Sequence, residues 1–119
     1  MVNDASEQAA AKAMVKTVFS EVADVYGDGI DFFGAFGRAL VAAADLAPGM
    51  RVLDLACGRG ACLLPAIEDV GPSGSVIGVD LAEPMVALLD ADLARRGVVN
   101  ASVRCGDAEA LAEPDQHVD

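Results

Sequence analysis

Three short apolar segments alternate with helical segments in the second part of the chain, and this order restricts the fold more than any other feature. Residues 51–56, 75–80 and 101–105 are rich in apolar and β-branched side chains, which favours strands. Between them, residues 63–70 and 82–96 carry apolar side chains at helical spacing. A strand–helix–strand–helix–strand order requires parallel strands joined by right-handed crossovers. The sequence therefore predicts an α/β fold with a parallel sheet and flanking helices.

Two further helices are predicted ahead of the first strand. Apolar side chains recur every three or four residues over residues 5–26 and again over residues 31–46. Two glycines within residues 26–29 separate the two patterns, and a Pro-Gly pair ends the second. We therefore expect an N-terminal helical segment at residues 1–46, followed by an α/β unit at residues 47–119.

The composition excludes several kinds of partner. The 119 residues suit a single domain, and 8 basic against 19 acidic side chains give a net charge of -11. This charge argues against nucleic acid and anionic membranes, which are bound by clustered Lys and Arg. Aromatic residues make up 4% of the chain and Trp is absent, so a platform for stacked bases is not expected. No apolar run approaches the ~20 residues needed to span a bilayer.

The cysteines and the single histidine suggest no metal site and no catalytic group. Cys57, Cys62 and Cys105 form no CxxC pair, and His117 alone cannot complete a zinc site. The sequence predicts reduced thiols in a cytoplasmic protein. Because His117 lies in a polar tail, we assign it no role as a base, and the catalytic residues stay unknown at this stage.

An aspartate lies near, at or just after the end of each of the three predicted strands. Asp54 lies near the end of the first strand, Asp80 ends the second, and Asp107 follows the third. In an open α/β sheet, ligands bind beyond the carboxyl ends of the strands, so these three carboxylates should border one crevice. Gly58 and Gly60 follow the first strand and allow a tight turn against a ligand.

Two ligand classes fit this pattern to different degrees. Asp80 lies 20 residues after Gly60, a spacing that suits a carboxylate binding two ribose hydroxyls in a dinucleotide or another nucleoside. A dinucleotide would place its pyrophosphate on the glycine loop, where Asp54 would repel it. S-adenosylmethionine has no phosphate and carries a cationic sulfonium and an ammonium group. Leu63 also replaces the third glycine of the dinucleotide motif GxGxxG.

The same residues resemble a known family. The loop VLDLACGRG at 52–60, the strand end VDLAEPM at 79–85 and GDAE at 106–109 are similar to motifs of class I S-adenosylmethionine-dependent methyltransferases. The DLACGxG form is most similar to the ubiquinone/menaquinone-biosynthesis type. The likeness covers residues 45–112 and is weaker in the leading helices. It implies a Rossmann-like parallel sheet, truncated after the third strand of a seven-stranded methyltransferase fold.

The resemblance also implies a set of cofactor-binding residues. Its motifs assign the methionine moiety to Asp54 and to the backbone of Ala56, Gly58 and Gly60. They assign the ribose hydroxyls to Asp80, and the adenine ring to Leu81, Met85, Asp107 and Ala108. The implied cofactor is S-adenosyl-L-methionine, and the implied reaction is transfer of its methyl group to a small-molecule acceptor.

Two residues depart from the family pattern. Ala56 stands where the family has the first glycine of the loop, and Ala82 stands where a Ser or Thr often caps the next helix. The resemblance further implies that the first strand lies between the third strand region, residues 101–105, and a fourth strand. Without that fourth strand, an unpaired edge at residues 51–56 predicts a homodimer or a swapped assembly.

Other interpretations remain open from the sequence. The chain could be part of an NAD(P)-binding oxidoreductase or a non-catalytic α/β interaction module. Asp54 and Asp80 could act only in turns or caps, and a structural role for Asp107 is as well supported as adenine contact. For Arg59 we favour a solvated side chain over a contact with the cofactor carboxylate. Aromatic residues ahead of the first strand could cover the cofactor or simply the sheet; they are Tyr26, Phe32 and Phe33.

Overall fold

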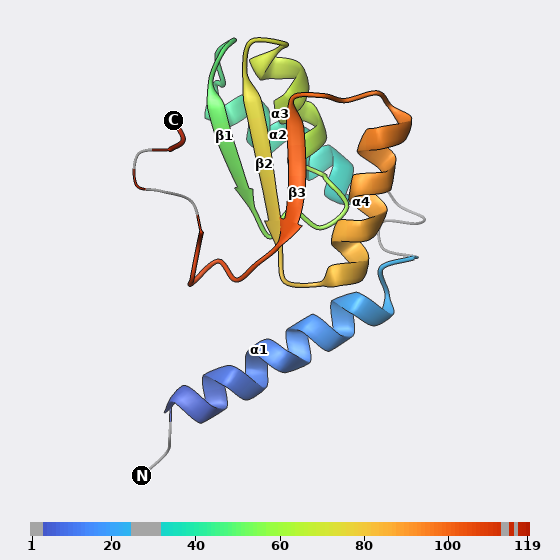
Figure 1. Cartoon of the computed structure of the whole chain (residues 1–119), viewed down its shortest axis with the longest axis vertical. Coiled ribbons are helices and arrows are strands. Elements are labelled where there is room, and N and C mark those ends of the chain that lie inside the picture. Colours follow the sequence, from blue (N-terminus) through green and yellow to red (C-terminus); the bar gives the residue numbers. More distant parts are fainter. Residues whose placement is uncertain (1–3, 25–31, 113–114, 116) are drawn as a thin grey trace.

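A computed structural model describes residues 4–24, 32–112, 115 and 117–119. The chain forms a three-stranded parallel sheet with helices packed against it (Figure 1). The elements in chain order are α1 (Asp4–Glu21), α2 (Phe32–Ala44), β1 (Arg51–Leu55), α3 (Leu63–Val70), β2 (Ser75–Asp80), α4 (Glu83–Arg95) and β3 (Ala101–Cys105).

The predicted strands are confirmed, with small differences at the ends of other elements. β2 and β3 have the predicted bounds, whereas β1 ends at Leu55 because Ala56 has a φ of 57°. The left-handed region interrupts the extended backbone and starts the turn. The first helix ends at Glu21, earlier than predicted. The break predicted at residues 26–29 lies outside the described residues.

The strand order is β1-β2-β3, with all pairs parallel. Leu53 is paired with Ile77, and Gly78 is paired with Val103. The expectation that the third region borders the first strand is therefore wrong, because β2 lies between them. The right-handed crossovers place α3 and α4 on the same face of the sheet, where one apolar cluster joins them to α2.

Close packing of α3 on the sheet forms the core. Leu63, Val70 and Leu89 are fully buried and pack with Val76 of β2. Gly78 makes this approach possible, because a Cβ at that position would lie 2.6 Å from Leu63 Cδ1. A glycine inside a strand commonly marks such a contact. The sheet and α3 are therefore held at the distance that brings the loop after β1 against the start of α3.

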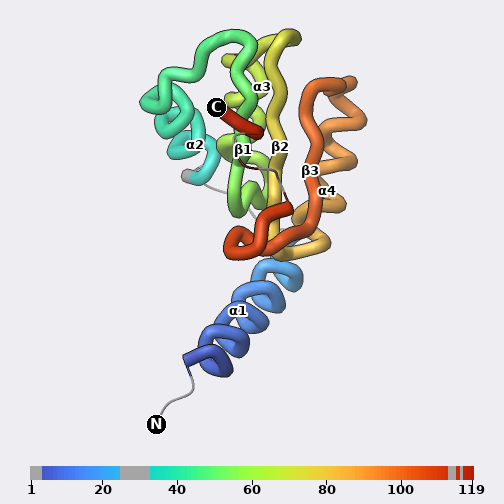
Figure 2. Tube along the Cα trace, turned by 60° about the vertical axis from the view of Figure 1, so that its left-hand side comes forward, coloured from blue at the N-terminus to red at the C-terminus, as the bar shows by residue number. Residues whose placement is uncertain are grey.

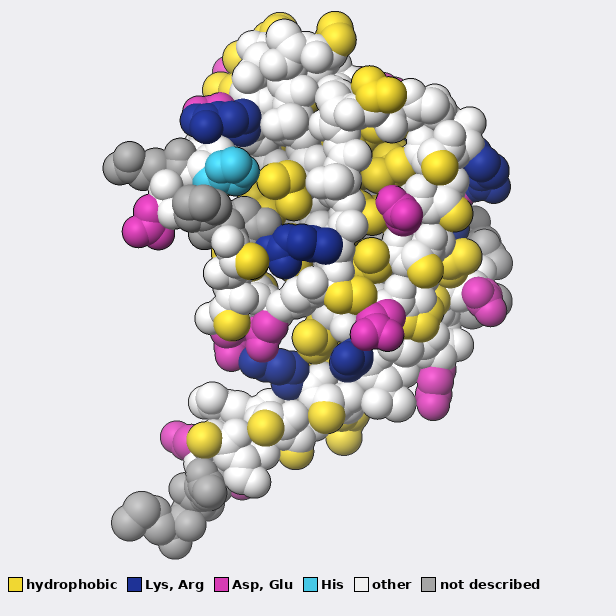
Figure 3. Space-filling model, in the orientation of Figure 1, with side chains coloured by type: hydrophobic (Ala, Val, Ile, Leu, Met, Phe, Trp, Pro, Cys, Tyr) yellow, Lys and Arg dark blue, Asp and Glu magenta, His cyan; other side chains and the backbone are white. Residues whose placement is uncertain are grey.

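Helix α1 extends away from this body (Figures 1 and 2). None of its residues is buried, and hydrophobic side chains are visible along its length in Figure 3. It is attached at two points. Lys12 forms ion pairs with Asp107 and Glu109, and Ala23, just after the helix, packs against α4. Within the described residues, no helix has the length and apolar character needed to cross a membrane.

The last residues return to the first strand. The chain runs from the end of β3 back toward β1 (Figures 1 and 2). The Asp119 amide donates to the Arg51 carbonyl oxygen at 2.7 Å, and the Arg51 amide donates to Asp119 Oδ2 at 2.8 Å. These two bonds satisfy the outer backbone groups of β1 at its first residue.

The left-handed turn at Ala56 generates a stability prediction. An L-residue with a side chain pays about 1–2 kcal/mol in this region, and the Ala56 methyl group is exposed, so it gains no packing. We expect Ala56→Gly to raise the free energy of unfolding by about 0.5–1 kcal/mol, after the extra unfolded-state entropy of glycine is subtracted. Urea denaturation measures the change.

The matched control is Ala91→Gly on the exposed face of α4, where the same chemical change should lower stability by about 1 kcal/mol. Opposite signs for the two variants support backbone strain at Ala56. A loss of stability in both would contradict it.

Candidate functional site

The loop after β1 is a tight turn held by backbone hydrogen bonds. Ala56, Gly58 and Gly60 have φ values of 57°, 52° and 92°. The Cys57 amide donates to the Val79 carbonyl oxygen at 3.1 Å, which ties the loop to β2. The Gly60 amide donates to the Cys57 carbonyl oxygen at 2.9 Å. These three residues, at every second position, thus bend the backbone back on itself at the carboxyl edge of the sheet.

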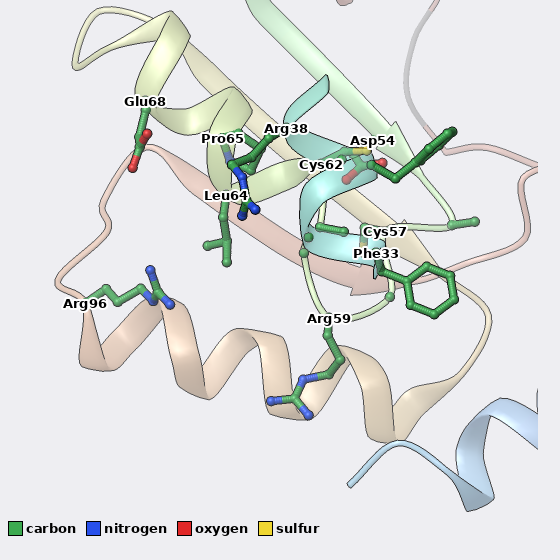
Figure 4. Close-up of a pocket in the computed structure, with 17 residues that line it drawn as sticks. Phe33, Arg38, Asp54, Cys57, Arg59, Cys62, Leu64, Pro65, Glu68 and Arg96 are labelled. Atoms are coloured by element: carbon green, nitrogen blue, oxygen red, sulfur yellow. The ribbon is translucent and has the colours of Figure 1, made fainter. Parts of the chain in front are cut away.

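Helix α2 closes one side of this loop. Gly37 lies so near to it that a Cβ would stand 2.1 Å from the Ala61 carbonyl oxygen. Between α2, α3 and the loop is a cavity of about 530 Å³ (Figure 4). Asp54, Ala56, Gly58 and Gly60, which the resemblance assigns to the methionine moiety, all line it.

A second cavity of about 280 Å³ adjoins the same loop. Asp80, Leu81 and Met85 line it, and α1 supplies Val15 and Phe19 as its outer wall. Ala56 and Gly58 border both cavities. The loop backbone therefore forms the common boundary of two cavities, each with one aspartate.

Asp54 is the most perturbed carboxylate of the site. Burial raises the pKa of Asp54 to about 6; the charge of Asp80 adds to the rise, and a backbone hydrogen bond at Leu63 opposes it. Asp54 Oδ2 is buried and accepts no hydrogen bond. A buried carboxylate oxygen without a donor is unfavourable. This side chain is therefore prepared for a cation or a strong hydrogen-bond donor.

Asp80 is held in place by two backbone amides. Gly58 donates to Asp80 Oδ2 and Ala82 donates to Asp80 Oδ1, both at 2.9 Å. The second bond serves the start of α4, where Ala82 offers no side-chain cap. Each carboxylate oxygen has two lone pairs, so both retain capacity for a ligand hydroxyl. Asp80 is thus fixed toward the smaller cavity while still able to accept hydrogen bonds.

Asp107 lies apart from the two cavities. Lys12 Nζ is 2.6 Å from Asp107 Oδ2, and the Glu109 amide donates to Asp107 Oδ1 at 2.9 Å. Hydrogen bonding to Lys12 lowers the pKa of Asp107. Neither Asp107 nor Ala108 is among the residues lining either cavity. The structure therefore brings together the other predicted residues and leaves this pair on the neighbouring loop.

Arg59 is bonded within the protein, in contrast to the solvated side chain favoured from the sequence. Its Nη1 donates to the Ala23 carbonyl oxygen at 3.1 Å, and its Nη2 lies 3.2 Å from Asp92 Oδ2. Both partners are more than 30 residues away in the chain, so no local pattern indicates them. Phe33 borders the larger cavity. Tyr26 and the Phe32 side chain lie outside the described residues.

Two wall residues, Val15 and Phe19, were not singled out by sequence reasoning. The apolar spacing of α1 was the available signal, but it indicates only a helix with an apolar face. What that face covers depends on where the turn after α1 attaches to α4.

The three thiols are free, and burial raises the pKa of each. For Cys57, burial raises the pKa to about 12. A thiol in this state is protonated and a poor nucleophile. Within the described part of the chain, no group of His, Cys, Asp or Glu side chains is arranged to hold a metal ion. The two cavities thus present the carboxylates of Asp54 and Asp80, and the larger one is also lined by Arg38, Arg59 and Arg96.

Comparison with known proteins identifies the family. Residues 52–119 match a family model described as a methyltransferase domain. The chain is 47% identical over 98 residues to nocamycin O-methyltransferase of Saccharothrix syringae, covering 82% of this chain and 35% of the relative. It is 39% identical to aklanonic acid methyltransferase DauC of a Streptomyces species, covering 91% of this chain and 50% of the relative.

Solved structures agree with this match. A SAM-dependent methyltransferase from Aquifex aeolicus aligns with a TM-score of 0.64 and 29% identity, covering 70% of this chain and 44% of that one. Coclaurine N-methyltransferase bound to N-methylheliamine and SAH aligns with a TM-score of 0.59 and 26% identity, covering 66% of this chain and 24% of that one.

The chain thus spans between about a third and half of the length of the two curated relatives. The matched part contains the glycine loop and the ends of all three strands. S-adenosylmethionine is the cofactor of this family, and a Rossmann-like α/β sheet is its fold. The chain belongs to the class I S-adenosylmethionine-dependent methyltransferases.

Proposed function

We propose that this chain binds S-adenosylmethionine. As part of a methyltransferase, it holds the cofactor whose methyl group is transferred to a small-molecule acceptor. The observation that carries the proposal is the buried Oδ2 atom of Asp54, which accepts no hydrogen bond, in a side chain that lines a cavity bordered by the glycine loop. A ligand with a cationic group would relieve the unfavourable burial of this charge. The ammonium and sulfonium groups of the cofactor supply such charges, and a dinucleotide pyrophosphate does not.

In this proposal the methionine moiety occupies the larger cavity. Asp54 accepts a hydrogen bond from the cofactor ammonium, and the backbone of Ala56, Gly58 and Gly60 borders the amino-acid end. The tight turn supports this role, because a loop without bulky side chains lets a ligand approach its backbone.

The adenosine moiety occupies the smaller cavity. Asp80 is prepositioned to accept hydrogen bonds from the ribose hydroxyls, and Leu81 and Met85 offer an apolar surface to the adenine ring. We retain Asp107 and Ala108 as proposed partners of the adenine edge. The Gly106 amide donates to the Asp80 carbonyl oxygen at 3.0 Å, which keeps their loop beside the ribose-binding strand end.

The chemistry proposed for the whole protein is methyl transfer. When bound, the cofactor supplies a methyl group activated by a sulfonium. An acceptor atom attacks the methyl carbon in line and displaces the sulfur. The residues of this chain fix the donor, and such alignment accounts for much of the rate in bimolecular transfers. A small-molecule acceptor is supported by relatives described as nocamycin and aklanonic acid methyltransferases.

In our proposal the two parts of the chain have different roles in cofactor binding. Residues 47–119 bind the cofactor, and residues 1–46 form a helical segment that supplies walls to both cavities. The three free cysteines accord with a reducing compartment, so we propose a cytoplasmic location.

Cofactor binding is tested by calorimetry and thermal shift. We expect S-adenosylhomocysteine to bind and to raise the melting temperature, whereas NADH does neither. Asp80→Ala should weaken binding at least about tenfold, because two charge-assisted hydrogen bonds worth about 1.5–3 kcal/mol each at most are lost. Asp90→Ala, at an exposed position of α4, is the matched control and should bind normally. Binding of NADH instead would refute the proposal.

A second test concerns the charge of Asp54. The folded-state pKa of about 6 exceeds the ordinary aspartate pKa of 3.8, so this group stabilises the fold below pH 3.8 and the contribution is lost as the pH rises through 6. We therefore expect the isosteric Asp54→Asn to raise the free energy of unfolding at pH 8 by up to about 2–3 kcal/mol, and to change it little near pH 3.5. Denaturation at both pH values measures the difference.

The same substitution should weaken S-adenosylhomocysteine binding, since that ligand keeps the ammonium group. In the unsubstituted protein, affinity should fall as the pH drops through about 6, and Asp54→Asn should remove this dependence. Asp90→Asn is the control for both measurements. If Asp54→Asn destabilised the free protein at pH 8, the carboxylate would have a favourable role that does not require a cation.

Pairing of two copies through β1 is a further part of the proposal. Among the described residues, β2 is the strand that pairs with β1, and the outer edge of β1 is bonded to Asp119 at Arg51. Leu55 at the other end of β1 is 44% exposed. An apolar strand edge favours association with a second strand. We expect concentration-dependent dimers in light scattering, weakened by Leu55→Lys and unaffected by Val99→Lys, whose side chain is 96% exposed away from the strands. A monomer at high protein concentration would refute this pairing.

A further inference from the structure

Arg59 connects three parts of the molecule. It lies in the glycine loop, and its side chain extends toward α4 (Figure 4). One terminal nitrogen donates to the Ala23 carbonyl oxygen at 3.1 Å, and the other lies 3.2 Å from Asp92 Oδ2 of α4. The guanidinium therefore bridges the loop of the larger cavity, the turn after α1 and the middle of α4.

The turn at Ala23 determines where α1 lies. Ala23 is buried with Ala82 and Met85, at the start of α4. Phe19 and Val15, about one and two helical turns before it, form the outer wall of the smaller cavity. A shift of Ala23 would therefore move Val15 and Phe19, which line the same cavity as Asp80.

The other polar attachment of α1 is weak by comparison. Lys12 and its partner Asp107 are each about one-third exposed, and Glu109 is 74% exposed. Ion pairs in such exposed positions are screened by water and contribute little to stability. The Arg59–Asp92 pair is more enclosed, with side-chain exposures of 27% and 17%, and Arg59 Nε is buried. Removing one member of an enclosed pair leaves a charge without compensation.

We propose that Arg59 is a positioning residue for cofactor binding, which holds α1 over the smaller cavity by bonding to Ala23 and Asp92. Arg59 borders the larger cavity, but both of its terminal nitrogens are engaged by Ala23 and Asp92, so the role we assign to it is to place the wall of the smaller cavity. This inference rests on the proposed binding of S-adenosylmethionine.

The placement of α1 can be followed without a ligand. The chain contains no Trp, so Phe19→Trp introduces a single fluorophore into the wall of the smaller cavity. In this background we expect Asp92→Asn to shift the Trp emission to the red, because α1 leaves its position and the indole enters water. Arg95→Gln is the matched control: Arg95 pairs with the other oxygen of Asp92 but is 74% exposed, and its loss should leave the emission unchanged.

The consequence for binding is measured by calorimetry with S-adenosylhomocysteine in proteins that keep Phe19. We expect Asp92→Asn and Arg59→Gln each to weaken binding roughly tenfold, the amount set by one charged hydrogen bond. Arg59→Lys should recover part of the loss, and Arg95→Gln should lose none. Asp92 is the informative position, because it lines neither cavity and its substitution removes no ligand contact.

The outcomes separate this inference from the function on which it rests. If Arg59→Gln weakens binding while Asp92→Asn changes neither affinity nor emission, Arg59 contacts the ligand directly and the inference is overturned. If the unsubstituted protein binds no S-adenosylhomocysteine, the proposed function fails. The emission shift then still decides whether Arg59 and Asp92 hold α1.

Discussion

The burial of a carboxylate at the end of a parallel strand is the constraint on which the site depends. Asp54 faces the helical side of the sheet, where Gly78 allows α3 to pack closely and exclude water. The right-handed crossovers bring Asp80 to the same edge, and its charge adds to the raised pKa of Asp54. Two neighbouring carboxylates and a loop of left-handed residues therefore follow from one packing geometry. This geometry is unfavourable in the free protein and suited to a cationic nucleoside.

Local strain and unsatisfied charge occur at the same turn. Ala56 adopts a conformation that favours glycine, and Oδ2 of Asp54, two residues earlier, lacks a hydrogen-bond donor. Neither feature improves the stability of the free chain, and both border the larger cavity. Strain of this kind persists where surrounding structure enforces it, and it is typical of ligand sites. The compensation comes from the buried cluster around Leu63 and Leu89, which fixes α3 and α4 on the sheet.

The sequence predicted the parts of the structure that local patterns control. The strand bounds, the parallel arrangement and the cavity positions of Asp54 and Asp80 follow from apolar runs that end in acids. The β1-β2-β3 order was missed, because strand order depends on how the crossovers pack. The bonds of Arg59 to Ala23 and Asp92 were missed for a related reason: they join segments 33 to 36 residues apart, and no short-range spacing encodes them.

Charge distribution then selects among ligands of similar size. The chain carries a net charge of -11, and each cavity contains an aspartate at its boundary with the loop. Arg59, the cation nearest in sequence to the glycines, is directed to Asp92 and is thereby neutralised within the protein. The larger cavity is also lined by Arg38, Arg59 and Arg96, so its charge is mixed. At the loop itself, Asp54 and Asp80 disfavour a pyrophosphate and favour a sulfonium and an ammonium. The pairing with Asp92 leaves the Arg59 guanidinium less available to a phosphate, which favours the methyl donor over a dinucleotide.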